Sequence, residues 1–291
     1  MGELSRAAWW SSLRPKTLVA GLVPVLVGSA LAARAGRFRV EALLLAGLGA
    51  LAIQLIVNLH NELADARRGA DAEDRVGPRR GLQSGMISAR ALKRAIAALL
   101  VFAVATGALL TWLAGPPILG IGVASLIAAF LYTGGPYPLA YLGIADVFVL
   151  AFFGWAAVLG TVFAHGAPID LDAFLVATAM GLLSTAILVV NNLRDRHTDA
   201  RVNKRTLAVR FGAGFARFEY VACLGLAFAC LGAVALRGAV GLALAAPLLA
   251  PAFLLARRVL AEDGPALNLR LEHTARLLAA LGVVSAVGVM L

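Results

Sequence analysis

The stretch LAIQLIVNLHNELAD at residues 51–65 ends a long apolar run with polar side chains at regular intervals. Asn58, Asn61 and Asp65 are spaced i, i+3, i+7, so a helix would carry all three on one face. An exposed carboxylate at the C-terminal end of a helix meets the negative end of the helix dipole, which costs roughly 0.3–1 kcal/mol. The cluster therefore needs a cation, supplied either by neighbouring Lys and Arg side chains or by a bound metal ion.

The stretch TAILVVNNLRDRHTD at residues 185–199 repeats this pattern 134 positions later. Asn192, Asp195 and Asp199 have the same i, i+3, i+7 spacing, and they also follow an apolar run. Two segments that share one pattern predict two helices with matching polar ends. Such a match also predicts that the two ends serve one site.

The composition is that of a membrane protein, with 61% hydrophobic and 14% charged residues in a chain of 291. A soluble domain would be about 25% charged, and the apolar runs approach the roughly 20 residues that a helix needs to cross a bilayer. We therefore predict an all-α, polytopic membrane protein that forms a single membrane-embedded domain, residues 1–291. The nine predicted transmembrane helices are Thr17–Ala33, Val40–Leu63, Leu92–Leu113, Ile118–Tyr132, Ile144–Ala164, Leu171–Leu193, Phe215–Leu236, Val240–Leu255 and Arg270–Leu291.

The distribution of positive charge predicts the orientation of these helices, because cytoplasmic loops carry an excess of Lys and Arg. With the N-terminus in the cytoplasm, 22 of the 26 Lys and Arg residues lie on the cytoplasmic side and the C-terminus lies outside. Both polar clusters then lie at cytoplasmic helix ends, after the second and the sixth span, as in a parallel repeat of four helices. Topology and anionic lipid explain the net charge of +10, so no nucleic acid partner is expected.

Loops that are rich in both acids and bases follow the two clusters. They contribute five further candidates for substrate binding, namely Asp71, Arg75, Arg80, Lys204 and Arg205. Mg²⁺ takes one or two carboxylates together with phosphate oxygens of a substrate, and Arg and Lys bind the remaining phosphate oxygens. The combination predicts a metal-bridged phosphate site. The alternative is a pair of solvated loops whose charges pair at the surface.

Asp146 lies at the predicted start of the fifth span, in YTGGPYPLAYLGIAD at residues 132–146. An acid at the membrane edge is costly and is therefore a candidate functional residue, here as a partner of a substrate hydroxyl or as a base. It is equally explained as an acid at the favourable N-terminal end of a helix. The Tyr132 ring could face a developing cation or belong to the aromatic belt of the membrane interface.

The paired Asp-rich motifs in a nine-helix frame resemble the UbiA superfamily of intramembrane prenyltransferases. More narrowly, they resemble its 1,4-dihydroxy-2-naphthoate polyprenyltransferase branch. The matching segments cover the chain from end to end, and the two central ones are specific. They are RPKTL at 14–18, residues 58–85 with their G-x-D-x-x-D-R-x-G-P core, YTGGPYPLAYLGIAD at 132–146, NNLRD with the following K-x-T-L at 191–207, and, more weakly, LNLRLEHTARL at 267–277.

Two positions depart from the superfamily pattern. Glu62 follows Asn61 where the superfamily usually has Asp, and Gly81 follows Arg80 where the broad family usually has Pro. The first acid of the loop is also displaced, from position 69 to Asp71. These departures favour the naphthoate branch over the 4-hydroxybenzoate branch.

The resemblance implies transfer of a polyprenyl chain from polyprenyl diphosphate to 1,4-dihydroxy-2-naphthoate, with loss of CO₂ and diphosphate and with Mg²⁺ as cofactor. Asp65, Asp195, Asp199 and Asp146 are then the expected catalytic residues. The expected metal ligands are Asn61, Asp65, Asp71, Asn192, Asp195 and Asp199. The expected substrate-binding residues are Asn58, Asn61, Asp71, Arg75, Arg80, Lys204, Arg205, Arg14, Lys16 and Tyr132, with Arg14 or Lys16 holding the aromatic carboxylate.

The resemblance also implies an integral protein of the bacterial cytoplasmic membrane, surrounded by lipid, with its active site facing the cytoplasm. Two other functions stay open. The same fold could prenylate another aromatic acceptor, such as 4-hydroxybenzoate or homogentisate. A secondary transporter is the second alternative, but transporters place charged sites near the bilayer midplane, whereas these acids gather at one membrane face.

Overall fold

The computed structural model describes residues 3–68, 80–136 and 138–291, and within these ranges its regular structure is entirely helical. Eight helical segments are long and apolar enough to cross a membrane, and the apolar helix Pro116–Leu131 is shorter, with 16 residues. The elements are α1 (Glu3–Leu13), α2 (Pro15–Arg34), α3 (Val40–Arg67), α4 (Ala89–Ala114), α5 (Pro116–Leu131), α6 (Leu139–Leu142), α7 (Ala145–Val149), η1 (Leu150–Leu159), α8 (Gly160–Ala164), α9 (Leu171–Arg201), α10 (Leu207–Leu236), η2 (Val240–Leu248), α11 (Leu249–Ala261), η3 (Gly264–Ala266) and α12 (Leu267–Met290).

The all-α prediction is confirmed, since each predicted span coincides with a helical segment of the described chain. Several observed bounds differ from the predicted ones: α10 begins at Leu207 and not at Phe215, and α11 ends at Ala261 and not at Leu255. Two further differences concern the polar clusters. α3 and α9 continue beyond the predicted ends of their spans, through the polar clusters, to Arg67 and Arg201. The polar residues therefore keep helical geometry, and each cluster stays on one helix face. The count of nine spans stays a prediction, because α5 falls short of the others in length.

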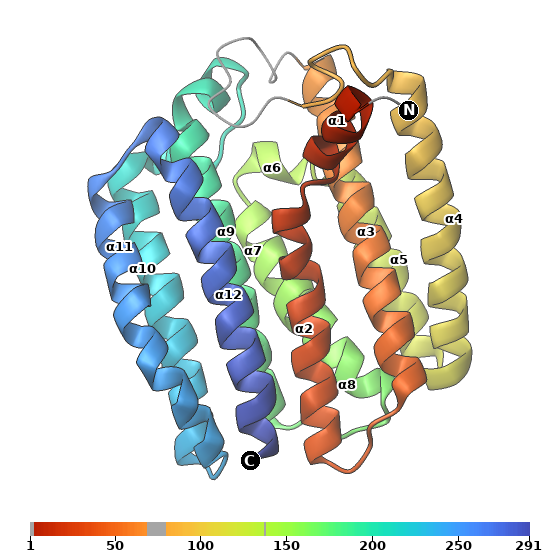
Figure 1. The fold of residues 1–291 in the computed structure, drawn as a ribbon, viewed down its shortest axis with the longest axis vertical. Helices are drawn as coiled ribbons and strands as arrows, with labels where there is room; N and C mark the ends of the chain where they lie inside the picture. Colours follow the sequence, from red (N-terminus) through yellow and green to blue (C-terminus); the bar gives the residue numbers. More distant parts are fainter. Residues whose placement is uncertain (1–2, 69–79, 137) are drawn as a thin grey trace.

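The helices form one bundle in which the first and last long helices, α2 and α12, lie side by side (Figure 1). α9 lies against α10, η1 and α12, and its Met180, Leu183 and Leu193 side chains are fully buried. The two chain ends lie at opposite ends of the bundle, and both polar clusters lie at the N-terminal end (Figure 1). This placement agrees with the predicted parallel direction of α3 and α9.

Glycines allow the closest helix contacts in the bundle. A Cβ atom on Gly154 of η1 would lie 2.7 Å from the Ala177 carbonyl oxygen, and one on Gly181 of α9 would lie 2.6 Å from the Leu150 carbonyl oxygen. Helices in a bilayer associate through such close packing, because lipid offers no hydrophobic driving force between them. The η1–α9 contact therefore fixes the wall on which the second polar cluster lies.

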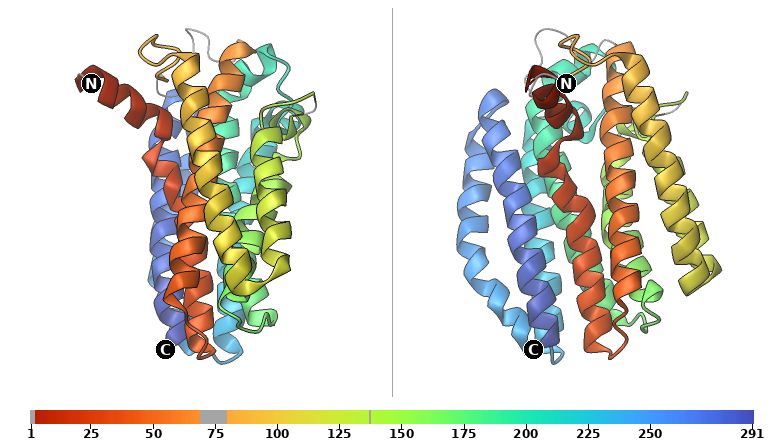
Figure 2. Two further views of the ribbon diagram at one scale, coloured as in Figure 1. Left: turned by 90° about the vertical axis from the view of Figure 1, so that its right-hand side faces the viewer. Right: turned by 45° about the vertical axis from the view of Figure 1, so that its right-hand side comes forward.

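The short helix α1 projects away from the bundle at the end that carries the polar clusters (Figure 2). Its turn into α2 is made at Arg14, which has a φ of 50° in the left-handed region. A non-glycine residue in this region is uncommon and is held by its surroundings. Here the Arg14 carbonyl oxygen accepts hydrogen bonds from both the backbone N–H and the side-chain Oγ1 of Thr17.

Candidate active site

A cavity of about 800 Å³ runs into the bundle from the end that carries the polar clusters. Residues of α2, α3, α5, η1 and α9 line most of it. Its deeper part is apolar, with Ile53, Leu110, Ile118 and Phe152 on its walls. The predicted site residues that line it are Arg14, Lys16, Asn58, Asn61, Asp65, Arg80, Tyr132, Asn192, Asp195, Asp199 and Lys204. The two clusters, far apart in sequence, therefore share one chamber.

The α3 wall holds its acid next to a buried arginine. Arg80 donates from Nη1 to Asp65 Oδ2 at 3.0 Å, and both side chains are about nine-tenths buried. The second oxygen, Asp65 Oδ1, is buried and has no hydrogen-bond partner among the described residues. Thr133 holds the neighbouring amide by donating from Oγ1 to Asn61 Oδ1 at 2.7 Å. These contacts fix Asn61 and leave one carboxylate oxygen of Asp65 open to a ligand.

The α9 wall repeats this arrangement with two acids. Arg194 donates from Nε to Asp195 Oδ1 at 2.7 Å and is itself buried. Lys204 donates from Nζ to Asp199 Oδ1 at 3.2 Å. Asp199 Oδ2 is buried without a hydrogen-bond partner in the described part of the chain. Arg194 also donates from Nη2 to Asp195 Oδ2 at 2.5 Å, so both oxygens of Asp195 are paired. On each wall, one acid therefore pairs one oxygen with a cation and leaves its other oxygen open: Asp65 on α3 and Asp199 on α9.

The charge of Lys204 links the two walls electrostatically. Burial lowers the pKa of this amine, but the carboxylates of Asp199, Asp65 and Asp195 outweigh the burial, so the pKa lies above its ordinary value. Lys204 is therefore a cation at neutral pH. Its attraction to acids on both α3 and α9 follows from the convergence of the two clusters.

The donor set of the chamber fits a hard cation. Mg²⁺ prefers oxygen ligands and is usually bound by one or two carboxylates together with water and substrate phosphate. The open oxygens Asp65 Oδ1 and Asp199 Oδ2 have this chemistry, as do the amide oxygens beside them. Among the described residues no group of three His, Cys, Asp or Glu side chains forms a metal site by itself. A metal ion here would thus need phosphate oxygens to complete its coordination shell.

Two predicted site residues are not brought to the chamber, and for two others the structure gives no position. Asp71 and Arg75 lie outside the described residues. The Arg205 side chain is exposed and does not line the cavity. Asp146 is buried in the first turn of α7 beside Thr185 of α9 and does not line the cavity either. The geometry therefore gives no support to Asp146 and Arg205 as site residues.

Lys16 is placed differently from Arg14, the other predicted carboxylate ligand. Both residues line the cavity, but the Lys16 ammonium forms an ion pair with Glu272 of α12, and 65% of its side chain is exposed. Lys16 therefore lies at the mouth of the cavity and links α2 to α12. Of the two residues, Arg14 has the more buried position.

Two side chains that line the chamber are absent from the predicted site residues. Gln54 is 7% exposed and lines the cavity one helical turn before Asn58, and Arg194 is the buried partner of Asp195. Gln54 could have been found, because an amide four residues before Asn58 lies on the same helix face. Arg194 stood out less, since it is one of several bases in its segment.

Two of the departures from the superfamily pattern, Glu62 and Gly81, hold the segment that carries Arg80. Glu62 is fully buried, and its Oε1 accepts the backbone N–H of Leu82 at 2.7 Å. The Gly81 N–H donates to Ser12 Oγ at 3.3 Å, which a proline could not do. A Cβ at Gly81 would also lie 2.5 Å from Ile87 Cδ1. Glu62 and Gly81 therefore fasten residues 80–87 against α3 and α1.

Replacing Glu62 by Ala is expected to lower both stability and activity. The Leu82 N–H would lose its buried acceptor, which costs about 1–3 kcal/mol, and Arg80 would lose its fixed position beside Asp65. Thermal unfolding in detergent and a turnover assay measure the two effects. Glu62→Gln keeps an oxygen acceptor and is the matched control, expected to lie close to the unmodified protein. Equal losses in both variants would contradict the role of the Leu82 hydrogen bond.

Known proteins resemble this chain in sequence over most of its length. The model of the UbiA prenyltransferase family matches residues 21–286. The 1,4-dihydroxy-2-naphthoate octaprenyltransferase of Escherichia coli is 42% identical over 229 residues, which cover 76% of this chain and 74% of that protein. The enzyme of the same name from Haemophilus influenzae is 37% identical over 255 residues, 83% of each chain.

A solved structure shares the fold at much lower identity. A UbiA homolog from Archaeoglobus fulgidus, bound to GPP and Mg²⁺, superposes with a TM-score of 0.71 at 17% identity, over 98% of this chain and all of that one. The chain therefore resembles known proteins in the arrangement of its helices as well as in sequence. On the family match and the identity to these relatives, the chain belongs to the UbiA prenyltransferase family.

Proposed function

We propose that this protein transfers a polyprenyl chain from polyprenyl diphosphate to 1,4-dihydroxy-2-naphthoate, releasing diphosphate and CO₂ and giving demethylmenaquinol for menaquinone biosynthesis. The observation that carries the proposal is the shared chamber, in which both aspartate clusters meet at the polar end of an apolar cavity. The names of the relatives that are 37–42% identical support the same donor and acceptor.

The two ends of the cavity suit the two ends of a polyprenyl diphosphate. The diphosphate would lie at the polar end, where Arg80, Arg194 and Lys204 supply positive charge. The prenyl chain would lie in the deeper, apolar part, where its transfer from water is favourable. Among the residues that the structure describes, the ligands for Mg²⁺ would be Asn61, Asp65, Asn192, Asp195 and Asp199. When bound, the ion supplies positive charge that stabilises the leaving diphosphate.

The protein's own residues would stabilise the charge of the leaving diphosphate and exclude water from the reacting carbon. The prenyl C–O bond breaks with its electron pair going to the diphosphate, and the buried cations of the chamber stabilise that charge in a site of low dielectric constant. Apolar walls keep water from the allylic carbon. Arg14, at the polar end, would hold the acceptor carboxylate by a charge-assisted hydrogen bond.

The acceptor chemistry balances without a general base. The new C–C bond takes its electron pair from the ring carbon that bears the carboxylate. The bond to the carboxylate then breaks, its electron pair returns to the ring, and CO₂ leaves. No proton is removed from that carbon. This agrees with the position of Asp146, the predicted base, which does not line the cavity.

The proposed location is the bacterial cytoplasmic membrane, with the chamber open toward the cytoplasm and the whole of residues 1–291 acting as one membrane-embedded domain. The excess of Lys and Arg at the chamber end supports this orientation. The opposite placement of the chain ends supports an odd number of crossings, with the N-terminus inside and the C-terminus outside (Figure 1).

A direct assay tests the proposed function. Protein purified in detergent is given polyprenyl diphosphate, Mg²⁺ and dihydroxynaphthoate labelled in its carboxyl carbon. We expect a prenylated quinol by mass spectrometry and one equivalent of labelled CO₂ for each product. Competition with 4-hydroxybenzoate and homogentisate checks the acceptor, and preference for either would overturn the assignment. Absence of product with every acceptor would overturn prenyl transfer itself.

A further inference from the structure

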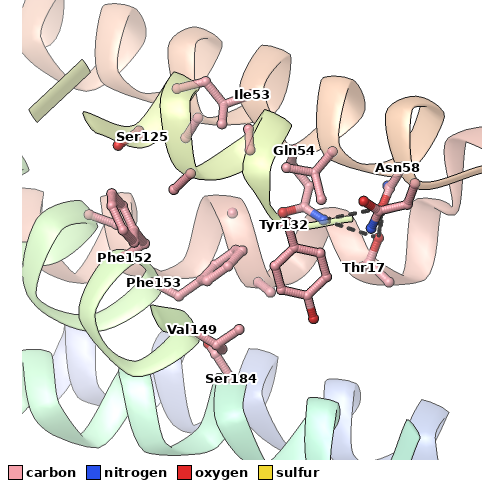
Figure 3. Close-up of a pocket in the computed structure, with 18 of the residues that line it drawn as sticks. Thr17, Ile53, Gln54, Asn58, Ser125, Tyr132, Val149, Phe152, Phe153 and Ser184 are labelled. Carbon is pink, nitrogen blue, oxygen red and sulfur yellow. Dashed lines mark hydrogen bonds between the residues drawn. The ribbon is translucent and has the colours of Figure 1, made fainter. Parts of the chain in front are cut away.

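Gln54 is a polar residue that neither the diphosphate nor a metal ion requires. It lies seven residues before Asn61 on α3, about 10 Å deeper along the helix axis. At this depth the cavity walls become apolar, with Ile53, Val149 and Phe153 nearby (Figure 3). An amide among lipid-facing helices is costly unless it is paired or functional.

The partners of Asn58 determine how the Gln54 amide is oriented. A backbone carbonyl oxygen can only accept, so the Asn58 atom 2.8 Å from the Leu13 carbonyl oxygen is Nδ2. Asn58 Oδ1 therefore faces Gln54 and must accept, at 3.4 Å, from Gln54 Nε2. The same Nε2 lies 3.5 Å from Thr17 Oγ1 (Figure 3). The chain Leu13–Asn58–Gln54 thus turns the Gln54 Oε1 atom away from Asn58.

The Gln54 Oε1 atom can accept a hydrogen bond from a ligand. Gln54 lines the cavity, and no described residue donates a hydrogen bond to its Oε1. The Tyr132 ring projects into the same cavity (Figure 3). A carbonyl oxygen of this kind accepts from an O–H or N–H group but offers nothing to an anion. Its natural partner is a neutral donor such as a phenol.

The sequence repeat separates Gln54 from the diphosphate machinery. A shift of 134 positions matches Asn58, Asn61 and Asp65 to polar residues on α9, but it matches Gln54 to Leu188. Leu188 also lines the cavity. The clusters that face the diphosphate are thus alike, but the deeper polar groups differ. The α3 wall, which adjoins α2 and Arg14, carries the Gln54 amide, whereas the deeper Ser184 of α9 donates its hydroxyl to the Met180 carbonyl oxygen of its own helix. Because the Gln54 amide has no counterpart on α9, it is better suited to the second substrate, the aromatic acceptor, than to the diphosphate.

We propose that Gln54 accepts a hydrogen bond from a ring hydroxyl of the aromatic acceptor, and so orients the ring beside the prenyl carbon and selects hydroxylated acceptors. The inference rests on the proposed function. With the acceptor carboxylate toward Arg14 and the hydroxyl on Gln54, the ring is held at two points. A hydroxyl that donates to Gln54 also keeps electron density on the ring, which favours attack on the allylic carbon.

The test combines substitutions of Gln54 with acceptors that lack one hydroxyl. Gln54→Met has nearly the same shape but no acceptor oxygen, and Gln54→Leu carries the residue of the matching α9 position. For each protein we would measure KM for dihydroxynaphthoate and for polyprenyl diphosphate. We would also measure the inhibition constants of 1-hydroxy-2-naphthoate and 4-hydroxy-2-naphthoate. The inhibitors need not react, so a poor substrate still reports binding.

Loss of one hydrogen bond is expected to raise KM for dihydroxynaphthoate about 10-fold in both variants. The analogue that lacks the hydroxyl bonded to Gln54 should have the same inhibition constant for both variants and for the unmodified protein. The analogue that keeps this hydroxyl should bind the variants about 10-fold more weakly than the unmodified protein. This is the result that a double-mutant cycle between the residue and the hydroxyl predicts. KM for polyprenyl diphosphate should stay within about twofold, which also shows that the variants are folded.

The outcomes separate this inference from the function on which it rests. Equal weakening of both analogues, or a matching rise in KM for polyprenyl diphosphate, would show a structural role and overturn the inference. Unchanged constants in an active protein would overturn it as well. An unmodified protein that makes no product from dihydroxynaphthoate would instead refute the proposed function, and the inference with it.

Discussion

Prenyl transfer by the double variant Asp65→Asn, Asp195→Asn is expected to fall by at least about 1000-fold, with each single variant losing about 100-fold, since removal of one electrostatic contact in an active site costs about 10²–10³ in kcat. The substitution keeps the size of each side chain and removes its charge. Asp65 and Asp195 lie on opposite walls of the chamber. Their loss would weaken metal binding from both sides.

The reduced charge also removes a carboxylate partner from each of two buried cations. Arg80 and Arg194 pair with Asp65 and Asp195 at 3.0 Å and 2.5 Å. Removal of one partner from a buried ion pair is destabilising by about 3–5 kcal/mol. Thermal unfolding must therefore be measured beside the rate. A rate measured below the unfolding temperature of the variant separates lost catalysis from lost structure.

The matched control is an acid at the other end of α9. Asp172 lies in the first turn of that helix and forms an ion pair with Arg237 at 2.6 Å, far along the helix from the chamber. Asp172→Asn should change the transfer rate by less than about twofold, because a partly exposed pair contributes about 0–1 kcal/mol. A folded double variant that keeps a tenth of the activity would rule out the proposed role of the clusters.

Removal of divalent ions is expected to abolish prenyl transfer, and Mg²⁺ should restore it. The carboxylate oxygens Asp65 Oδ1 and Asp199 Oδ2 are negative and would repel a diphosphate, unless a divalent cation lay between them and the phosphate oxygens. Treatment with a chelator followed by titration with Mg²⁺ measures the effect. In Asp65→Asn the half-maximal Mg²⁺ concentration should rise about 10-fold or more, because one charged ligand is missing.

Binding gives a second readout that does not depend on turnover. A ligand that binds only the folded state raises the unfolding temperature. Mg²⁺ together with a non-reactive diphosphate analogue should therefore stabilise the protein more than either does alone. Full activity after complete chelation, or equal stabilisation by the analogue with and without Mg²⁺, would contradict a metal-bridged diphosphate.

The amino-acid sequence determined the helical architecture and the nature of the site. Apolar runs and a 3.6-residue period are local properties, so the helices and the shared face of Asn58, Asn61 and Asp65 follow from them. The repeat of that face in α9 predicted that two clusters serve one chamber. The residues that line the cavity include both clusters, together with Arg14, Arg80, Tyr132 and Lys204.

Only the tertiary structure decided which further polar residues reach the chamber. Helical spacing fixes the angle between side chains on one helix, but the rotation of each helix about its axis is set by packing against its neighbours. Gln54 faces the cavity and Asp146 does not, although both are polar residues in apolar surroundings. Contacts such as Glu62 with Leu82 and Thr133 with Asn61 join segments 20 and 72 residues apart. Such contacts depend on how the chain folds back on itself, and no local pattern encodes them.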